Sequence, residues 1–426
     1  MVNNLKRFFL VFFVLSIVLS SLVLASAQES KKPITIRVFH TASTESNQLI
    51  ERVNEFTEMT GINVIVDIVP RAVFNQRLLQ TLIEETGDYD VVMPVGGLDY
   101  TTYVNKGAYI PIEDYLTKEE VEQFYGRKNF TDPRTGKMAA IPQAHNWQML
   151  YYRKDLLNDP KEKLAFKEKY GRELTVPKSL QEVYEVAEFF HRPPEMYGYF
   201  VSGLEWSWAC EYRNYLFGEG ENYGDKEGNL TLNGPGAIKA MEYMVKLTKF
   251  APPGWEAMSF FDGNTLMGEG KLLMYNGYSN IWGTFCKEMP DKVGIALPLG
   301  EVEPGVALSG WLTFIPKNVP NLEEAVKFVK WIGSYDYQKN IMIDLPGNFS
   351  SREDVLADPD IRKMVKSIEK IDEALLYLHV PQITWGTEVN SGLYEVFFKV
   401  IKGEMTATEG LNWLQNKKFA GRRAIE

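Results

Sequence analysis

The sequence has few of the residues that build reactive or cross-linked sites. Of its 426 residues only two are cysteine and four are histidine. Two cysteines are too few for a disulfide framework. Cys210 and Cys286 either form one bridge or remain two buried thiols, and the sequence leaves both alternatives open. His40 and His145 sit at a predicted strand end and a predicted crossover, where either a ligand role or simple packing is consistent with the pattern. The four histidines lack metal-ligand spacing, so we expect no metal.

Catalytic motifs are also missing. The chain contains no His-Glu-x-x-His, Gly-x-Ser-x-Gly or Cys-x-x-Cys sequence. Residues 263–268 resemble the start of a phosphate-binding loop, but Glu269 stands where that loop requires lysine. We therefore expect neither an enzyme nor a cofactor. The alternative, a secreted carbohydrate-active enzyme, needs two carboxylates across a glycosidic bond; Glu205 and Asp99 are nominees that no spacing rule links.

Positive charge is scarce and dispersed. The chain has 46 basic and 56 acidic residues, a net charge of −10, and no long run of lysine or arginine. This balance argues against nucleic acid or anionic membranes as partners. For an anionic solute, Arg352 is the one basic residue near a predicted lobe opening that we would name.

Only one long apolar run is present. It spans residues 8–24, follows Lys6 and Arg7, and ends in Ala25-Ser26-Ala27. This arrangement predicts a secretory signal peptide over residues 1–27, because the small-x-small exit favours cleavage over a retained membrane anchor. No cysteine follows the run, so a lipid anchor is not expected. We expect the mature protein to be periplasmic.

The length predicts two lobes, because 426 residues exceed what one hydrophobic core commonly organises. Between Pro33 and Tyr109 strand-like and helix-like patterns alternate as β-α-β-α-β, which predicts a parallel, doubly wound sheet. Ligands of such sheets bind beyond the carboxyl ends of the strands. In this sequence those ends are residues 40–43 and 95–99.

Tryptophan is plentiful, with nine in the chain. Flat aromatic rings match the apolar faces of sugars, and a few fixed polar groups match their hydroxyls. Five tryptophans fall in segments predicted as loops, where ligand contact and core packing are both open: Trp206, Trp208, Trp282, Trp311 and Trp385. Trp331 and Trp413 lie on amphipathic helical patterns and are expected in the core.

Several short segments occur in the order typical of one family. They are residues 34–39, 56–62, 87–92, 107–114, 141–142, 150–157, 176–183, 233–241, 268–274, 310–317 and 324–334. Together they resemble family 1 of the extracellular solute-binding proteins of ABC importers, the group that includes maltose-binding protein. The resemblance covers nearly the whole mature chain.

The resemblance implies an α/β fold of two lobes, each a doubly wound, mainly parallel sheet flanked by helices, joined by a multi-strand hinge. It places residues 28–142 and 310–352 in the N-terminal lobe and residues 145–306 and 355–426 in the C-terminal lobe. The hinge segments lie near residues 142–146, 306–311 and 347–354. Such proteins capture a solute by closing their lobes and deliver it to a membrane permease, commonly as monomers.

The resemblance also implies ligand contacts, with a sugar or oligosaccharide as the leading solute. In the N-terminal lobe they are Gly97 and Asp99, in a loop that lacks the family's tryptophan. Across the hinge and the C-terminal lobe they are Asn146, where the family's receptor has a glutamate, and Glu205, Trp206, Trp208, Tyr212, Tyr278 and Trp385. The loop tryptophans Trp282 and Trp311 join the candidate contacts because of their aromatic rings. A receptor that reports to a membrane sensor would have the same lobes and pocket, so only the partner separates it from a transport receptor.

Overall fold

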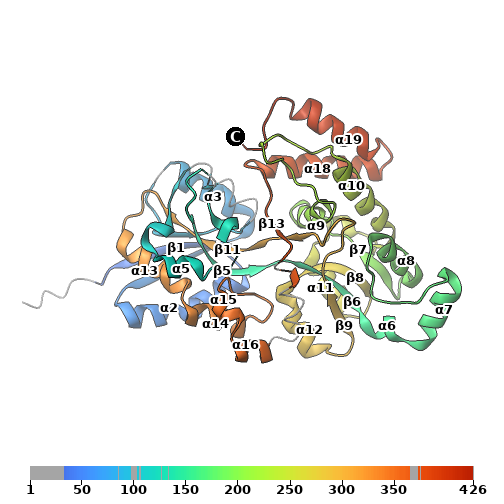
Figure 1. Ribbon diagram of the computed structural model, residues 1–426, viewed down its shortest axis with the longest axis horizontal. Helices are drawn as coiled ribbons and strands as arrows, with labels where there is room; N and C mark the ends of the chain where they lie inside the picture. Colours follow the sequence, from blue (N-terminus) through green and yellow to red (C-terminus); the bar gives the residue numbers. More distant parts are fainter. Residues whose placement is uncertain are drawn as a thin grey trace, which may run out of the picture.

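The protein folds into two lobes joined by crossing strands (Figure 1). The computed structural model describes residues 33–84, 86–96, 103–104, 107–125, 127–132, 134–364, 373–374 and 376–425. The predicted signal peptide lies outside these ranges. Within them, no helix is both long and apolar enough to cross a membrane.

The first lobe confirms the predicted β-α-β-α-β unit. Strands β1, β2 and β3 form a parallel sheet in the order β2-β1-β3. Gly61 ends α2 in the left-handed conformation, as its position predicts. The elements of this lobe, with the hinge strands, are β1 (Thr35–Thr41), α2 (Thr44–Thr60), β2 (Asn63–Val69), α3 (Arg71–Ile83), β3 (Val91–Met93), β4 (Tyr109–Ile110), α5 (Lys118–Glu122), β5 (Ile141–Asn146), β11 (Ser309–Thr313), β12 (Ile315–Pro316), α13 (Leu322–Ile332) and α14 (Tyr335–Asp344).

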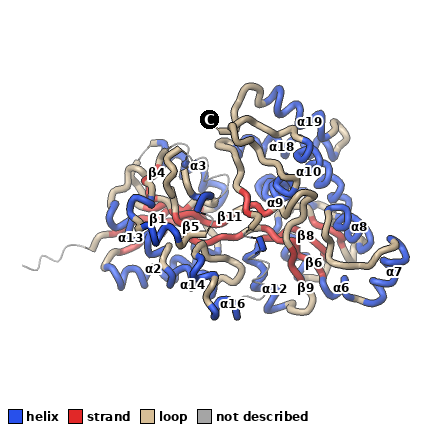
Figure 2. The backbone as a smooth tube through the Cα atoms, viewed as in Figure 1, coloured by secondary structure: helices blue, strands red, loops and turns tan. Residues whose placement is uncertain are grey.

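The second lobe carries a four-stranded sheet in the order β7-β8-β6-β9, surrounded by helices (Figure 2). Its elements are β6 (Gln148–Arg153), α6 (Lys154–Asn158), α7 (Pro160–Tyr170), α8 (Leu180–Phe190), β7 (Tyr197–Phe200), α9 (Glu205–Gly218), α10 (Pro235–Leu247), α11 (Phe260–Gly268), β8 (Leu272–Tyr278), α12 (Trp282–Glu288), β9 (Val293–Ala296), β10 (Val306–Ala307), α15 (Glu353–Leu356), α16 (Pro359–Met364), β13 (Leu378–His379), α18 (Gly386–Ile401) and α19 (Ala407–Trp413).

One detail of the predicted fold needs correction. The sheet of the second lobe is mixed, not mainly parallel: β7 and β8 are parallel, whereas β6 is antiparallel to both β8 and β9. The reason is the hinge. Strand β6 enters the lobe directly from β5, so its chain direction is set by the crossing and not by a helical crossover.

The lobes are connected by paired strands. β5 and β11 run antiparallel, with Asn146 opposite Ser309 and Ala144 opposite Trp311. A third segment joins them through a bridge between His145 and Phe349. Gly310 in β11 has φ +125°, and a Cβ there would lie 2.1 Å from the Ala144 carbonyl oxygen. Glycine is therefore required where these two backbones approach.

A buried glutamine ties the crossing segments together. The amide nitrogen of Gln338, on α14, donates to the carbonyl oxygens of Pro142 and Gln143 on β5 at 3.0 and 2.9 Å. Its amide oxygen accepts from the Ser350 hydroxyl at 2.9 Å and the Ser351 backbone N–H at 3.0 Å. One side chain thus satisfies backbone groups of two different crossings.

Two hydrophobic cores correspond to the lobes. One gathers buried side chains from residues 36–141 and 308–337, and the other from residues 144–307 and 341–424. Helix α14 contributes to both, because Tyr337 packs in the first core and Ile341 in the second. The exact lobe boundaries predicted from the sequence stay a prediction.

Candidate functional site

The carboxyl ends of β1 and β3 in the first lobe, and of β7, β8 and β9 in the second, face the hinge; β6 runs the opposite way. In the first lobe, Trp311 bridges Val95 just after β3, and its ring lies 4.8 Å from that of His40 near the end of β1. In the second, Tyr278 ends β8 and pairs with Gln148, two residues beyond Asn146. A continuous path of paired residues therefore joins the two edges at which α/β sheets bind ligands.

Aromatic side chains cluster at the carboxyl edge of the second lobe. The Trp206 ring lies 5.3 Å from Phe260 and 6.2 Å from Phe261, and Phe260 lies 4.8 Å from Tyr278. Trp206 is 49% exposed and Phe261 is 59% exposed. We call these four residues the aromatic patch. Exposed, contiguous apolar surface beside a strand edge is the kind of platform that a ligand covers.

Helix α9 separates the predicted aromatic residues into two groups. The sequence prediction placed Trp206 and Trp208 in a loop, but α9 begins at Glu205. Two residues apart on a helix means about 200° of rotation, so the two rings face opposite sides. Trp208 is fully buried, and its ring is stacked on that of Tyr212 at 5.1 Å. Trp208 and Tyr212 are core residues in this structure, and only Trp206 reaches the surface.

Polar groups continue from the aromatic patch toward the hinge. The Tyr278 hydroxyl shares hydrogen bonds with Cys210 and with the Ser309 side chain, and burial raises the Tyr278 pKa well above its ordinary value. Asn146, opposite Ser309, is only 7% exposed. Its amide donates to the Asn348 oxygen at 3.4 Å, while its own oxygen is buried without a partner. A buried acceptor of this kind needs a donor from a group other than the described side chains.

The remaining predicted residues are more dispersed. Trp385 donates to the Arg423 carbonyl at 2.7 Å and lies beneath the Arg422 guanidinium, so the end of the chain covers it. Trp282 is half-buried at the start of α12 and packs near Tyr151. Gly97 and Asp99 lie outside the described residues.

Glu205 is engaged within its own lobe. Its carboxylate accepts a hydrogen bond from the Ser391 hydroxyl on α18. Of the two carboxylates that the hydrolase alternative nominated, Glu205 is therefore engaged in a hydrogen bond within its own lobe. The other, Asp99, lies outside the described residues.

His40 and His145 are buried and contact other side chains of the protein, and both cysteines are thiols. His40 is fully buried and pairs with Gln143 at 3.2 Å, and His145 stacks on Phe130 at 5.1 Å. Burial lowers the His145 pKa to about 4. Cys210 and Cys286 are not joined by a disulfide. Among the described residues, no group of three or more His, Cys, Asp or Glu side chains could hold a metal ion.

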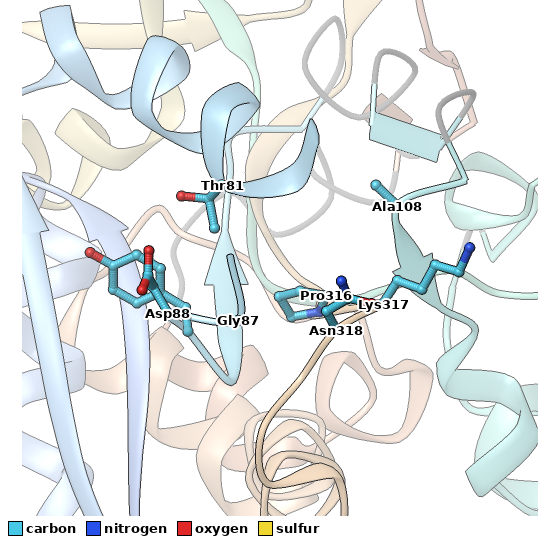
Figure 3. A pocket seen from close by; sticks show the side chains of 8 residues that line it. Thr81, Gly87, Asp88, Ala108, Pro316, Lys317 and Asn318 are labelled. Atoms are coloured by element: carbon cyan, nitrogen blue, oxygen red, sulfur yellow. The ribbon is translucent and has the colours of Figure 1, made fainter. Parts of the chain in front are cut away.

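A small pocket lies elsewhere in the first lobe (Figure 3). It is about the size of one water molecule and is lined by Thr81, Gly87, Asp88, Tyr89, Ala108, Pro316, Lys317 and Asn318. Residues 87–89 precede β3, so the pocket sits at the amino end of that strand. It is on the opposite edge of the sheet from the hinge, and we do not assign it to the ligand.

Two features of the site escaped the sequence prediction. Phe260 and Phe261 open α11, where Ser259 and Asp262 form a capping box. The capping box indicates a helix start in the sequence, but no local pattern predicts that this start faces the end of β8. Arg213 was likewise missed, because its place on the Trp206 face of α9 depends on where the helix begins.

Comparison with known proteins identifies the family of this chain. The family model described as bacterial extracellular solute-binding protein matches residues 42–339. The chain belongs to this family. A "probable ABC transporter-binding protein" of Deinococcus radiodurans is 23% identical over 311 residues, covering 65% of this chain and 70% of that protein. An uncharacterised ABC transporter extracellular-binding protein of Pyrococcus horikoshii is 22% identical and covers 73% and 69%.

Solved structures share the fold. A solute-binding protein of Agrobacterium radiobacter in complex with ribitol superposes with a TM-score of 0.76 at 22% identity, covering 90% of this chain and 98% of that one. A Thermotoga lettingae protein bound with tagatose gives 0.73 at 22% identity, covering 89% and 97%. A maltose-bound Thermotoga maritima protein gives 0.75 at 21% identity, covering 90% and 98%. These similarities establish the two-lobe α/β fold of a solute-binding protein.

Proposed function

We propose that this solute-binding protein captures a sugar or polyol between its lobes and presents it to the permease of an ABC importer. The aromatic patch carries the proposal. Trp206 and Phe261 expose large flat surfaces at the strand edge that faces the hinge. Sugar rings and polyol chains have C–H faces that stack on such surfaces, and hydroxyls that need fixed polar partners nearby.

Closure of the lobes is the mechanism that we propose. A ligand held by both lobes binds the closed arrangement more tightly than the open one, so binding shifts the population toward closure. In the first lobe Trp311 stands at the strand edge, and in the second lobe the aromatic patch does. The β5–β11 pair between them is the segment about which the lobes would rotate.

Further parts of the proposal come from the family and the sequence. The partner is a membrane permease, the protein acts outside the cytoplasm after removal of residues 1–27, and it works as a monomer without catalysis. Neutral sugars and polyols are the solutes found in the similar structures described above, which makes them the first probes to try.

A thermal-shift screen of the purified mature protein tests this function. The panel contains D-mannitol, ribitol, D-tagatose, maltose, D-glucose, D-glucuronate, spermidine and L-amino acids. A ligand that binds only the folded state raises the unfolding temperature, by about 2.7 kcal/mol of stabilisation at 100 times its Kd. We expect a shift with a carbohydrate or polyol, recovered chemically intact. A shift only with spermidine or an amino acid would overturn the solute class, and consumption of the sugar would overturn the receptor function.

A further inference from the structure

Arg213 lies on the ligand-facing side of α9. Trp206, Cys210 and Arg213 are spaced by four and three residues, so they share one face of the helix. This is the face opposite to the buried Trp208. Tyr278 lies against it, because it contacts Cys210 and is close enough to influence Arg213 electrostatically. Arg213 therefore stands between the aromatic patch and the hinge.

The partners of Arg213 are all neutral. Its guanidinium donates to the Cys210 sulfur at 3.2 Å and to the Tyr223 side chain. In the part of the chain that the structure describes, no carboxylate lies within ion-pair distance of it. Two other arginines with little exposure differ: Arg153 and Arg352 each form a 2.6 Å pair with an aspartate.

The N–H groups that remain on Arg213 are open to a ligand. A guanidinium has five N–H donors in a planar fork, and the two neutral partners use only part of them. No nitrogen of Arg213 is both buried and without a hydrogen-bond partner, so any nitrogen that lacks a protein partner is accessible to solvent. A half-buried cation with no carboxylate is costly unless something supplies acceptors. The buried, unpartnered oxygen of Asn146, across Ser309 from Tyr278, adds an acceptor on the hinge side.

We propose that Arg213 binds two adjacent oxygens of the captured solute, while the aromatic patch covers its C–H face. Adjacent oxygens occur both in the carboxylate of a sugar acid and in the vicinal hydroxyls of a neutral sugar or polyol, and the guanidinium fork fits either pair. Arg213, and not the aspartate-paired Arg352, is then the cation of the site. This inference rests on the proposed function and names its polar contact.

Calorimetric titration of Arg213→Gln and Arg213→Lys tests the inference. The probe is whichever panel member binds the wild type most tightly. We expect Gln to weaken binding about 100-fold and Lys at least about tenfold, because lysine keeps the charge but loses the two-pronged donor. Arg192→Gln is the matched control, since Arg192 pairs with Glu162 far from the site, and it should bind within about twofold of wild type. If Arg213→Gln lowers the unfolding temperature of the unliganded protein, the Arg213→Lys variant provides the test of binding instead.

A second readout separates ligand contact from a structural role. An analogue of the probe that lacks one of the two adjacent oxygens should bind wild type about tenfold more weakly, but should lose nothing further in Arg213→Gln. If D-glucuronate binds more tightly than D-glucose and its affinity falls with salt, the oxygens are a carboxylate; salt-insensitive binding of a neutral probe identifies hydroxyls.

The failures of the two proposals are distinguishable. Wild-type binding with unchanged affinity in both Arg213 variants overturns this inference and leaves the proposed function standing. Equal losses for the probe and its analogue in Arg213→Gln overturn it as well, because the residue would then act on the fold. A wild type that binds no sugar, sugar acid or polyol overturns both.

Discussion

Two tryptophans in one short segment have opposite surroundings. Trp206 is half exposed beside Phe260, whereas Trp208 is fully buried against Tyr212 and Phe397. We predict that Trp206→Ala weakens sugar binding at least tenfold while changing the free energy of unfolding of the unliganded protein by less than about 1 kcal/mol. Calorimetric titration and urea denaturation measure the two effects.

Trp208→Ala is the control for that experiment, because it removes the same side chain from the same helix. It should lower the free energy of unfolding by about 3–5 kcal/mol through the cavity that it leaves. If Trp206→Ala proved the more destabilising of the two and bound ligand normally, the assignment of the aromatic patch would be contradicted.

Glu211 predicts a pH dependence of stability. It is buried and accepts hydrogen bonds from the Ser202 backbone and the Tyr199 and Tyr215 hydroxyls, and burial raises its pKa to about 7. Between its ordinary pKa near 4.5 and about 7 the folded protein keeps a proton that the unfolded chain releases, so this group makes stability fall as pH rises.

Glu211→Gln removes this titration. The free energy of unfolding of the variant, measured relative to wild type, should increase by about 3 kcal/mol between pH 4.5 and 7.5. Urea denaturation at several pH values measures it. Glu51→Gln, at an exposed position on α2, is the control for the substitution itself. A flat difference for Glu211→Gln would mean that its carboxyl titrates normally in the fold.

At the level of elements, β5 and β11 can pair closely only because Gly310 has no side chain. Gly310→Ala combines a φ of +125° with a Cβ 2.1 Å from the Ala144 oxygen. We expect it to lower the free energy of unfolding by about 3 kcal/mol or more, because the strands must separate. Gly136→Ala, with φ +71° and open space around it, should cost only about 1 kcal/mol. Equal costs, measured by urea denaturation, would show that the strands move apart freely.

The sequence predicted those elements whose cause is local. The alternation at Ile36 and Val38, the stop at Gly61 and the capping box from Thr406 to Glu409 all appear in the structure where the residues indicate. The start of α9 was not predicted, because Leu204 caps it without a side-chain hydrogen bond. That single boundary decides which face carries Trp206, Cys210 and Arg213, so the site was only partly predictable.

At the level of the whole molecule, the two-lobe fold was predictable from length, the first β-α-β-α-β unit and the ordered segments of the family resemblance. The mixed sheet of the second lobe was not, because β6 enters from the hinge and pairs with β8, which lies far along the sequence. The covering of Trp385 by Arg422 and Arg423 is a similarly distant contact. No sequence pattern within either segment predicts this contact.

Lobe closure makes a prediction for the whole molecule. Saturating amounts of the sugar or polyol found in the screen should reduce the radius of gyration measured by X-ray scattering, because the ligand favours the closed arrangement. At a ligand concentration close to the wild-type Kd, Trp206→Ala should show a smaller reduction than the wild type, since it binds the ligand more weakly. Saturation of the wild type without any change in scattering would contradict closure.

Because the chain crosses between the lobes three times, the order of its synthesis determines when each hydrophobic core can be completed. The first core needs Leu308–Ile315 and Ala325–Tyr337 to be complete, although its opening strand begins at Thr35. During translation the N-terminal strands must therefore wait while the sheet of the second lobe is made, with their apolar faces uncovered. Neither core is built from one contiguous piece of chain. Gln338, which joins two crossings late in the sequence, emerges only after β5 has been exposed for most of that time.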